Sequence, residues 1–377
     1  MIKHQSPLET VATLSEMSTL DIDINQSNRY CIKLNSAQGK DAYYFATPIY
    51  HAISRKLVNR NFVASNGYYR FVGSNCEATV TATQLKLIQG GNAFCLNFGT
   101  AVSWILQKGS LISDRLSITP TYNGVIIEGK INQSTFDIST NFSYQKIRES
   151  QNCVCFMEEQ FKPILVISAL YVETSNNDFH PLQIKYQNAS KNMVSVCLST
   201  DALLCTRGSF EINFYEPKLI QDTPVSGKHP KENNAFSPIA FVGNTDFYGT
   251  QWLYFRLDLS KMPELQSQYI REVKLYIPRI TSNSAALEMF GLENRFCSFG
   301  SNWSNKVPKK GKTNRVGMRG DYICLDLTST YITHGQMIQS LGNVLVPAQS
   351  GALGYQVLST GDSYVLPPIL CVKYAKQ

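Results

Sequence analysis

The feature that most constrains the fold is a period of two in the apolar residues between Phe247 and Pro278. It runs on both sides of a turn-like segment around Pro263, at Leu253, Phe255, Leu257, Leu259, Val273, Leu275 and Ile277. The residues between them are expected to face water: Tyr254, Arg256, Asp258, Glu272, Lys274 and Tyr276. A period of two is typical of half-buried strands rather than of a helix. Burial of each large apolar side chain contributes ~1.5–3 kcal/mol, so we expect a second sheet to cover this face.

The rest of the chain has the same β character. From about residue 29 to residue 208, apolar runs alternate with turn-prone segments, and Asn123-Gly124 between two such runs is a strong hairpin signal. The stretch 100–109 fits either a short helix or a buried strand. No internal repeat indicates a propeller or a solenoid. We therefore predict an all-β protein with two β-sandwich domains, 26–208 and 209–377, divided at Arg207-Gly208.

Residues 1–25 are predicted to form a short N-terminal helix and tail. Ser6 as N-cap, Pro7 at the first helical position and Glu9 three residues after the cap fit a helix start. Apolar residues then recur every three positions, at Leu8, Val11, Leu14, Met17 and Leu20. Such a helix can dock on a partner or guide export, but terminal helices more often pack on their own domain, which is what we expect.

Composition limits the class of protein. The chain has 377 residues, of which 43% are hydrophobic, enough for packed cores. The start lacks the apolar core of a secretory signal, and no run approaches the ~18 apolar residues of a membrane span. Ten cysteines without Cys-x-x-Cys spacing predict mostly reduced thiols, so we expect synthesis in the cytoplasm without classical secretion. Export or release by a non-classical route is left open. The net charge of +7 either favours acidic partners or only aids solubility.

Five ordered pieces of the C-terminal half carry a resemblance to a known family. After the entry segment QDTPVSGKHPKENNAFSPIAFVGNTDFYGTQ, Phe255–Ser260 reads FRLDLS and leads through a Pro-containing loop to a second alternating strand. GSNWSNKVP, YICLDLTS and STGDSYVLPPILCVKY follow in order. Over about residues 209–377 this set resembles the DNRLRE (disaggregatase-related) domains. The resemblance implies a jelly-roll-like sandwich, found in surface and secreted proteins with polysaccharide-binding members, and it does not imply an enzyme.

Signatures of metal and nucleotide chemistry are incomplete. None of the five histidines has a partner at metal-ligand spacing. A calcium-like loop starting at Asp21 lacks its glycine and its final glutamate, and Gly311-Lys312-Thr313 lacks the first glycine of a P-loop. Cys153 and Cys155 share a strand face and can hold a soft metal, although a plain buried pair is more common. We therefore predict no cofactor and no metal.

Paired carboxylates leave an enzyme as the third alternative. A glycosidase needs only two carboxylates that the fold brings together, and Asp258, Asp326 and Asp362 lie in or beside the predicted strands. Outward-facing strand carboxylates are usually solvated or paired with a cross-strand basic residue, here Arg256 or Lys274. We predict that the protein is not an enzyme and keep a polysaccharide lyase or hydrolase only as this third alternative.

The stretch from Ser301 to Asp321 has the most functional content. It holds Trp303 and six basic residues: Lys306, Lys309, Lys310, Lys312, Arg315 and Arg319. Glycine and proline within it predict a loop at one end or rim of the sandwich. An exposed indole can stack on a sugar face, and basic side chains can contact carboxylates or sulfates. The alternative is that Trp303 is structural and the loop merely solvated.

We therefore predict a non-catalytic surface protein that binds an acidic polysaccharide or another cell-surface glycan. The predicted ligand-binding residues are Trp303, Lys309, Lys310, Lys312, Arg315 and Arg319, with Tyr248 and Trp252 as sugar-stacking neighbours. The alternative is a structural or assembly subunit of a surface layer, a phage-like particle or a toxin complex. Nucleic acid is not an expected partner, because no aromatic-interleaved strand motif accompanies the basic residues.

Overall fold

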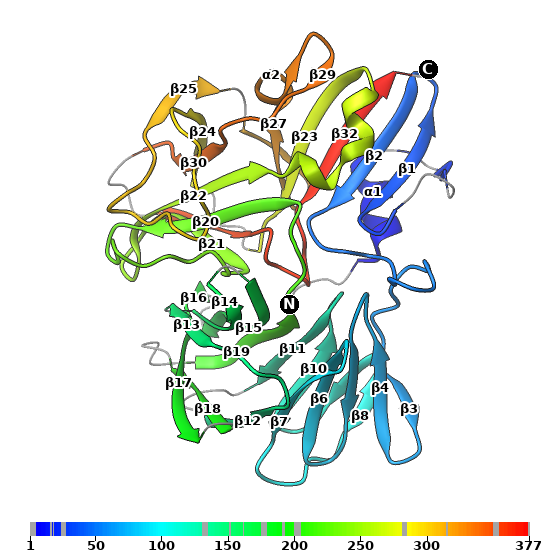
Figure 1. Ribbon diagram of the computed structural model, residues 1–377, viewed down its shortest axis with the longest axis vertical. Coiled ribbons are helices and arrows are strands. Elements are labelled where there is room, and N and C mark those ends of the chain that lie inside the picture. Colours follow the sequence, from blue (N-terminus) through cyan, green and yellow to red (C-terminus); the bar gives the residue numbers. More distant parts are fainter. Residues whose placement is uncertain are drawn as a thin grey trace. The chain divides into compact units, whose positions relative to one another are not determined.

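The computed structural model describes residues 5–15, 17, 19–23, 28–129, 135–150, 152–160, 162–174, 179–190, 193–199, 205–280, 285–313, 316–349 and 354–375. Strands dominate this part of the chain, and they pair antiparallel in sheets that pack face to face (Figure 1). The all-β prediction with sandwich-like sheets is therefore confirmed. Over the described residues, no helix combines the length and the apolar character needed to cross a membrane.

The chain forms two compact units, and they differ from the predicted division. Unit 1 combines residues 1–49 with 217–377, and unit 2 spans residues 50–216. The early strands β1 (Cys31–Ser36) and β2 (Gly39–Phe45) belong to unit 1, because β2 pairs with β32 (Ile369–Ala375) near the end of the chain (Figure 1). The predicted boundary at 208 falls inside a strand of unit 2, β19 (Cys205–Phe214).

Unit 1 contains two facing sheets. The β23 sheet has the order β1-β2-β32-β23-β27-β26, with β23 at Ile270–Pro278, β27 at Tyr322–Asp326 and β26 at Val316–Arg319. The β22 sheet has the order β25-β24-β30-β22-β21-β31, with β20 also paired to β22. The strands of the β22 sheet span the following residues: β20 Ile220–Ser226, β21 Ile239–Thr245, β22 Gly249–Leu257, β24 Leu287–Leu292, β25 Lys309–Thr313, β30 Asn343–Pro347 and β31 Gly354–Ser359. The chain passes several times between the two sheets, for example from β22 to β23 and from β23 to β24.

Short elements connect these strands. They are the 3-10 turns η1 (Leu259–Lys261) and η2 (Pro263–Ser267), the short helix α2 (Thr328–Tyr331), and the pair β28 (Ile332–Thr333) and β29 (Gln336–Met337). The N-terminal helix α1 (Pro7–Ser15) starts as predicted, since the Ser6 amide donates to Glu9 Oε2 at 2.7 Å and the Glu9 amide donates to Ser6 Oγ at 3.2 Å. It ends five residues before the predicted limit at Leu20.

The core of unit 1 lies between its two sheets and confirms the predicted alternation. All seven apolar residues of the predicted pattern are at most 9% exposed and belong to one hydrophobic cluster, which also contains Tyr44 and Val372 from the β23 sheet. The prediction that Tyr254, Arg256 and Tyr276 face water is wrong, because they are 1%, 4% and 4% exposed. On the outer face of the β22 sheet, Tyr254 packs in a second cluster with Phe296 and Val344, and its hydroxyl donates to the Val307 carbonyl at 2.8 Å.

Unit 2 also has two sheets. The β19 sheet has the order β13-β14-β15-β19-β11-β10-β9-β8, with β16 on β15, and the β12 sheet has the order β17-β18-β12-β7-β6-β5-β4-β3. The rings of Phe136 on β12 and Phe210 on β19 lie 5.7 Å apart, which shows that the sheets face each other. The predicted hairpin at Asn123-Gly124 joins β10 to β11. Residues Ile105–Gln107 of the ambiguous stretch form the exposed strand β8 rather than a helix.

The bounds of the unit 2 strands are β3 Val63–Ser65, β4 Tyr68–Val72, β5 Glu77–Val80, β6 Gln84–Gln89, β7 Asn92–Asn97, β8 Ile105–Gln107, β9 Ser110–Ile112, β10 Leu116–Pro120, β11 Gly124–Gly129, β12 Thr135–Thr140, β13 Lys146–Ser150, β14 Cys153–Glu159, β15 Lys162–Thr174, β16 Phe179–His180, β17 Gln183–Ser190, β18 Met193–Ser199 and β19 Cys205–Phe214.

Candidate functional site

The basic stretch is not the single loop that the sequence predicted. Lys309–Thr313 form β25 at one edge of the β22 sheet, and Val316–Arg319 form β26 at an edge of the β23 sheet. Edge strands tolerate such a density of lysine and arginine, because charge there discourages pairing with another chain. Within the described part of this stretch, the residues before β25 form a loop, and Arg319 lies on a different sheet from Lys309.

The structure brings two tryptophans together on the outer face of the β22 sheet. Trp252 projects from β22 beside Tyr254, and its ring centroid lies 5.0 Å from that of Trp303, with an angle of 58° between the planes. Trp303 sits in a tight turn, in which Asn302 Oδ1 accepts hydrogen bonds from the amides of Ser304 and Asn305 at 2.9 and 3.2 Å. Both indoles are half-buried, packed against the outer cluster that contains Tyr254.

Two lysines place positive charge over these rings. Lys306 Nζ lies 4.1 Å from the Trp303 ring centroid and 5.6 Å from that of Trp252. Lys309 Nζ lies 4.8 Å from the Trp252 centroid and 4.4 Å from that of Phe290. Each cation–π contact of this kind contributes ~0.5–1 kcal/mol at an exposed site. We call Trp252, Phe290, Trp303, Lys306 and Lys309 together the Trp–Lys surface.

The other predicted site residues do not belong to this surface, and for two of them the side chain lies outside the described residues. Tyr248 is 5% exposed, with its ring 5.5 Å from that of Phe241, so it offers no open face to a sugar. Lys310 is exposed in β25, next to Lys309. Arg319 is half-buried in β26. Lys312 belongs to β25, while its side chain and all of Arg315 lie outside the described residues.

Neither Lys306 nor Phe290 was among the ligand-binding residues predicted from the sequence. A signal for Phe290 was present, because it alternates with the buried Leu287 and Met289 and so lies on the opposite face of β24. Lys306 was noted only as one of six basic residues. Its position over Trp303 depends on the turn at Asn302, because the Lys306 ammonium donates a hydrogen bond to the Trp303 carbonyl at 3.3 Å.

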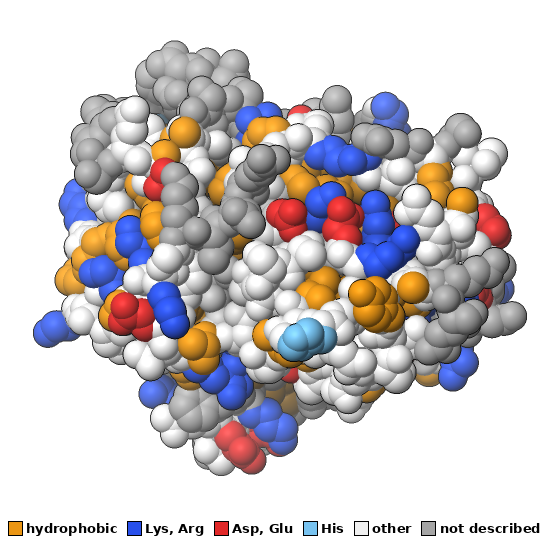
Figure 2. Space-filling view, turned by 90° about the horizontal axis from the view of Figure 1, so that it is seen from above, with side chains coloured by type: hydrophobic (Ala, Val, Ile, Leu, Met, Phe, Trp, Pro, Cys, Tyr) orange, Lys and Arg blue, Asp and Glu red, His pale blue; other side chains and the backbone are white. Residues whose placement is uncertain are grey.

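Charge on the visible surface is mixed rather than gathered in one basic face. In the view of Figure 2, basic and acidic side chains lie close together among hydrophobic patches. Ion pairs of this mixed kind include Lys274–Glu272 at 2.6 Å and Lys373–Glu272 at 3.2 Å on the β23 sheet. At the Trp–Lys surface, two lysines lie near one ring, with Lys306 Nζ 5.6 Å and Lys309 Nζ 4.8 Å from the Trp252 centroid.

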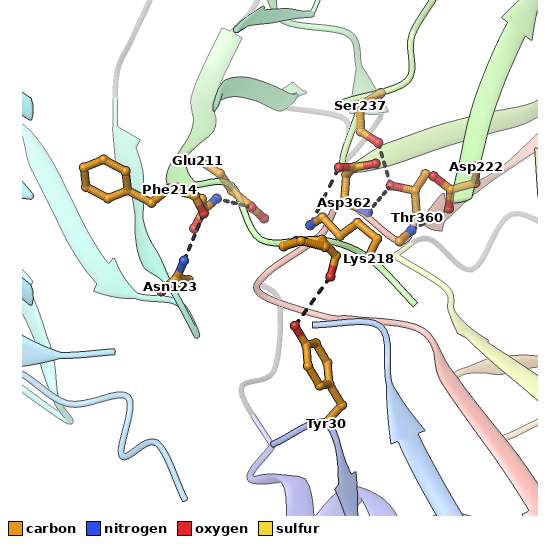
Figure 3. A network of polar contacts seen from close by, with 12 residues as sticks. Tyr30, Asn123, Glu211, Phe214, Lys218, Asp222, Ser237, Thr360 and Asp362 are labelled. Atoms are coloured by element: carbon orange, nitrogen blue, oxygen red, sulfur yellow. Dashed lines mark hydrogen bonds and ion pairs between the residues drawn. The ribbon is translucent and has the colours of Figure 1, made fainter. Parts of the chain in front are cut away.

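The predicted carboxylates have separate local contacts. Asp258 Oδ1 accepts from the Ser260 amide at 3.2 Å and caps η1, and Asp326 Oδ1 accepts from the Thr328 amide at 3.0 Å before α2. Asp362 lies in a buried polar network with Lys218 (Figure 3). None of the cysteines whose side chains the structure describes forms a disulfide. Cys153 and Cys155 are both buried: Cys153 Sγ lies 3.0 Å from Ser150 Oγ, and Cys155 Sγ donates to Met157 Sδ at 3.2 Å.

Comparison of the sequence with known proteins does not assign the chain to a family. A scan of the sequence against protein-family models finds no match, and a search among curated proteins finds no relative. The resemblance to the DNRLRE domains therefore stays a prediction.

Proposed function

We propose that this protein binds an acidic polysaccharide through the Trp–Lys surface. The observation that carries the proposal is the pair of tryptophans 5.0 Å apart with Lys306 and Lys309 held over their rings. An indole offers a flat apolar face to the C–H groups of a sugar ring, and a lysine contacts a carboxylate or sulfate as a point charge. Both requirements of an acidic sugar are thus met within one small area.

The arrangement also favours binding through pre-organisation. An exposed ion contact contributes only ~0–1 kcal/mol, partly because ordering a long side chain has an entropic cost. Lys306 is already ordered by the Trp303 ring and the Trp303 carbonyl, and Lys309 by Trp252 and Phe290. Less freedom is therefore lost when an anion arrives. The attraction acts between partly exposed charges, so it should weaken as salt is added.

A glycan array with the full chain at low and high salt tests this proposal. The unmodified protein should bind acidic glycans at low salt, and the double variant Lys306→Glu, Lys309→Glu should lose most of that signal. A matched double reversal of exposed lysines outside the surface, Lys56→Glu with Lys261→Glu, should retain it. Acidic-glycan binding that survives the first pair of changes would show that the ligand binds elsewhere.

An assembly subunit is the second candidate, and one observation favours it. The edge strands β3 and β8 of unit 2 are exposed along their length and present large apolar side chains, with Val63 64% and Ile105 68% exposed. Unpaired edges of this kind are templates for strand addition. Light scattering after size exclusion should then show concentration-dependent oligomers that Ile105→Lys reduces, whereas a monomer at every concentration would exclude this function.

A further inference from the structure

A buried lysine and a buried aspartate meet inside unit 1. Lys218 lies two residues before the first residue of β20, and Asp362 lies in the connection from β31 to β32. Lys218 Nζ is 3.6 Å from Asp362 Oδ1, and the two side chains are only 4% and 9% exposed (Figure 3). The Lys218 nitrogen therefore lies next to the Asp362 carboxyl group, and groups held together in this way react with little further loss of freedom.

The surroundings hold both groups in place. The Lys218 ammonium lies 3.7 Å from the centroid of the Tyr364 ring. The turn that carries Asp362 is fixed on both sides: the Asp362 amide donates to Thr360 Oγ1 at 3.2 Å, and Thr360 Oγ1 donates to the Ser237 carbonyl at 2.5 Å. The neighbouring Gly361 amide donates to Asp222 Oδ2, also at 2.5 Å. Asp362 is therefore presented to Lys218 by a pre-formed turn rather than by a mobile side chain.

Burial favours the uncharged forms of this pair. Removal from water raises the pKa of Asp362 to about 6, although the Lys218 ammonium opposes the shift. Transfer of one proton from the ammonium to the carboxylate removes both buried charges, and each of these costs several kcal/mol in desolvation. The result is a neutral amine beside a protonated carboxyl group, which are the two reactants of amide formation.

We propose that Lys218 and Asp362 join through an intramolecular isopeptide bond. The lone pair of Lys218 Nζ attacks Asp362 Cγ, the N–C bond forms, and the C–O bond to the protonated carboxyl oxygen breaks. The amine gives up one proton to the departing hydroxyl, so one water leaves and no oxidant, reductant or other reactant is needed. The closed surroundings disfavour the reverse reaction, because they exclude water. The bond ties the start of β20 to the connection that leads into β32.

The mass of the intact, denatured full chain tests this proposal. It should be lower than the mass calculated from the sequence by one water, and Lys218→Arg and Asp362→Ala should restore the full mass. Trypsin should leave Lys218 uncut and release one branched peptide containing both residues. Asp362→Asn should give the same branched peptide with loss of ammonia in place of water, a result that a mere ion pair cannot produce.

Lys33 and Glu264 provide a matched control, because their charged atoms are also 3.6 Å apart while Glu264 is 32% exposed. Lys33→Arg should therefore leave the loss of one water unchanged. The proposal is overturned if the unmodified protein has the full calculated mass, or if the lost water maps to any other pair of residues. Neither result depends on whether a variant folds, since the unmodified protein alone decides it.

Discussion

Asp222 is a buried carboxyl group whose protonation should set the pH dependence of unit 1. It is 3% exposed, and burial raises its pKa well above the ordinary value of 3.8. The folded protein therefore holds this proton to a higher pH than the unfolded chain does. The folded state is favoured most at low pH, and this contribution is lost as the pH rises from about 4 through the raised pKa.

The variant Asp222→Asn should remove this dependence, because an amide does not titrate and its oxygen can still accept from the Gly361 amide. As the pH rises above 4, the free energy of unfolding of the unmodified protein should fall relative to that of the variant. The slope for one proton is at most about 1.4 kcal/mol per pH unit. Urea unfolding at a series of pH values measures it, and parallel curves for the two proteins would contradict the assignment.

For single residues, the alternating pattern predicted correctly which apolar strand residues are buried. It did not predict which of the polar residues between them are buried as well. Tyr254 and Arg256 alternate with the core as expected, yet their own face is covered too. Arg256 Nη2 donates to Gln221 Oε1, a residue of the neighbouring strand β20. Alternation reports only which residues share a face, and whether a distant segment covers that face depends on long-range packing.

The covering element is the segment between β24 and β25, which packs on the outer face of the β22 sheet. Phe296 is its buried anchor, 2% exposed, with its ring 6.0 Å from that of Tyr254. Replacement of a fully buried phenylalanine by alanine costs ~3–5 kcal/mol. We expect Phe296→Ala to lower the free energy of unfolding by this amount. The substitution should also make the position of Trp303 in the Trp–Lys surface less well ordered, because Trp303 belongs to the same segment.

Urea unfolding with an unchanged m value checks the stability change, and Ser304→Ala is the control. Ser304 is exposed in the same segment and contributes its backbone amide to the turn, so its substitution should change the free energy by less than about 0.5 kcal/mol. A small effect of Phe296→Ala would mean that the segment is not a stabilising cover.

Elements that depend on pairing partners were the hardest to predict. Lys309–Thr313 carries three lysines and a glycine, a composition that indicates a loop, yet it pairs with β24. Its hydrogen bonds come from a strand that is itself held by the core, through Met289. Local composition therefore failed where a neighbouring strand supplies the structure, and it succeeded at Ser6 and Glu9, where the capping contacts are local.

At the scale of the whole chain, unit 2 is an insertion into unit 1. The sequence could not reveal this, because both parts have the same β-rich composition and the decisive pairing joins β2 to β32 at opposite ends of the chain. The two points where the chain leaves and re-enters unit 1 are close together. The Ile49 amide donates to the Arg29 carbonyl at 2.9 Å, and the adjacent Tyr30 hydroxyl donates to the Pro217 carbonyl at 3.5 Å.

We therefore expect each unit to fold without the other. A short Gly/Ser linker in place of residues 50–216 should leave unit 1 folded, since it has to join only ends held by neighbouring residues. Residues 50–216 alone should also fold, because both sheets of unit 2 are formed within that range. Circular dichroism should show β structure in both fragments, each with a cooperative thermal transition. A fragment that unfolds without cooperativity would mean that its core depends on the other unit.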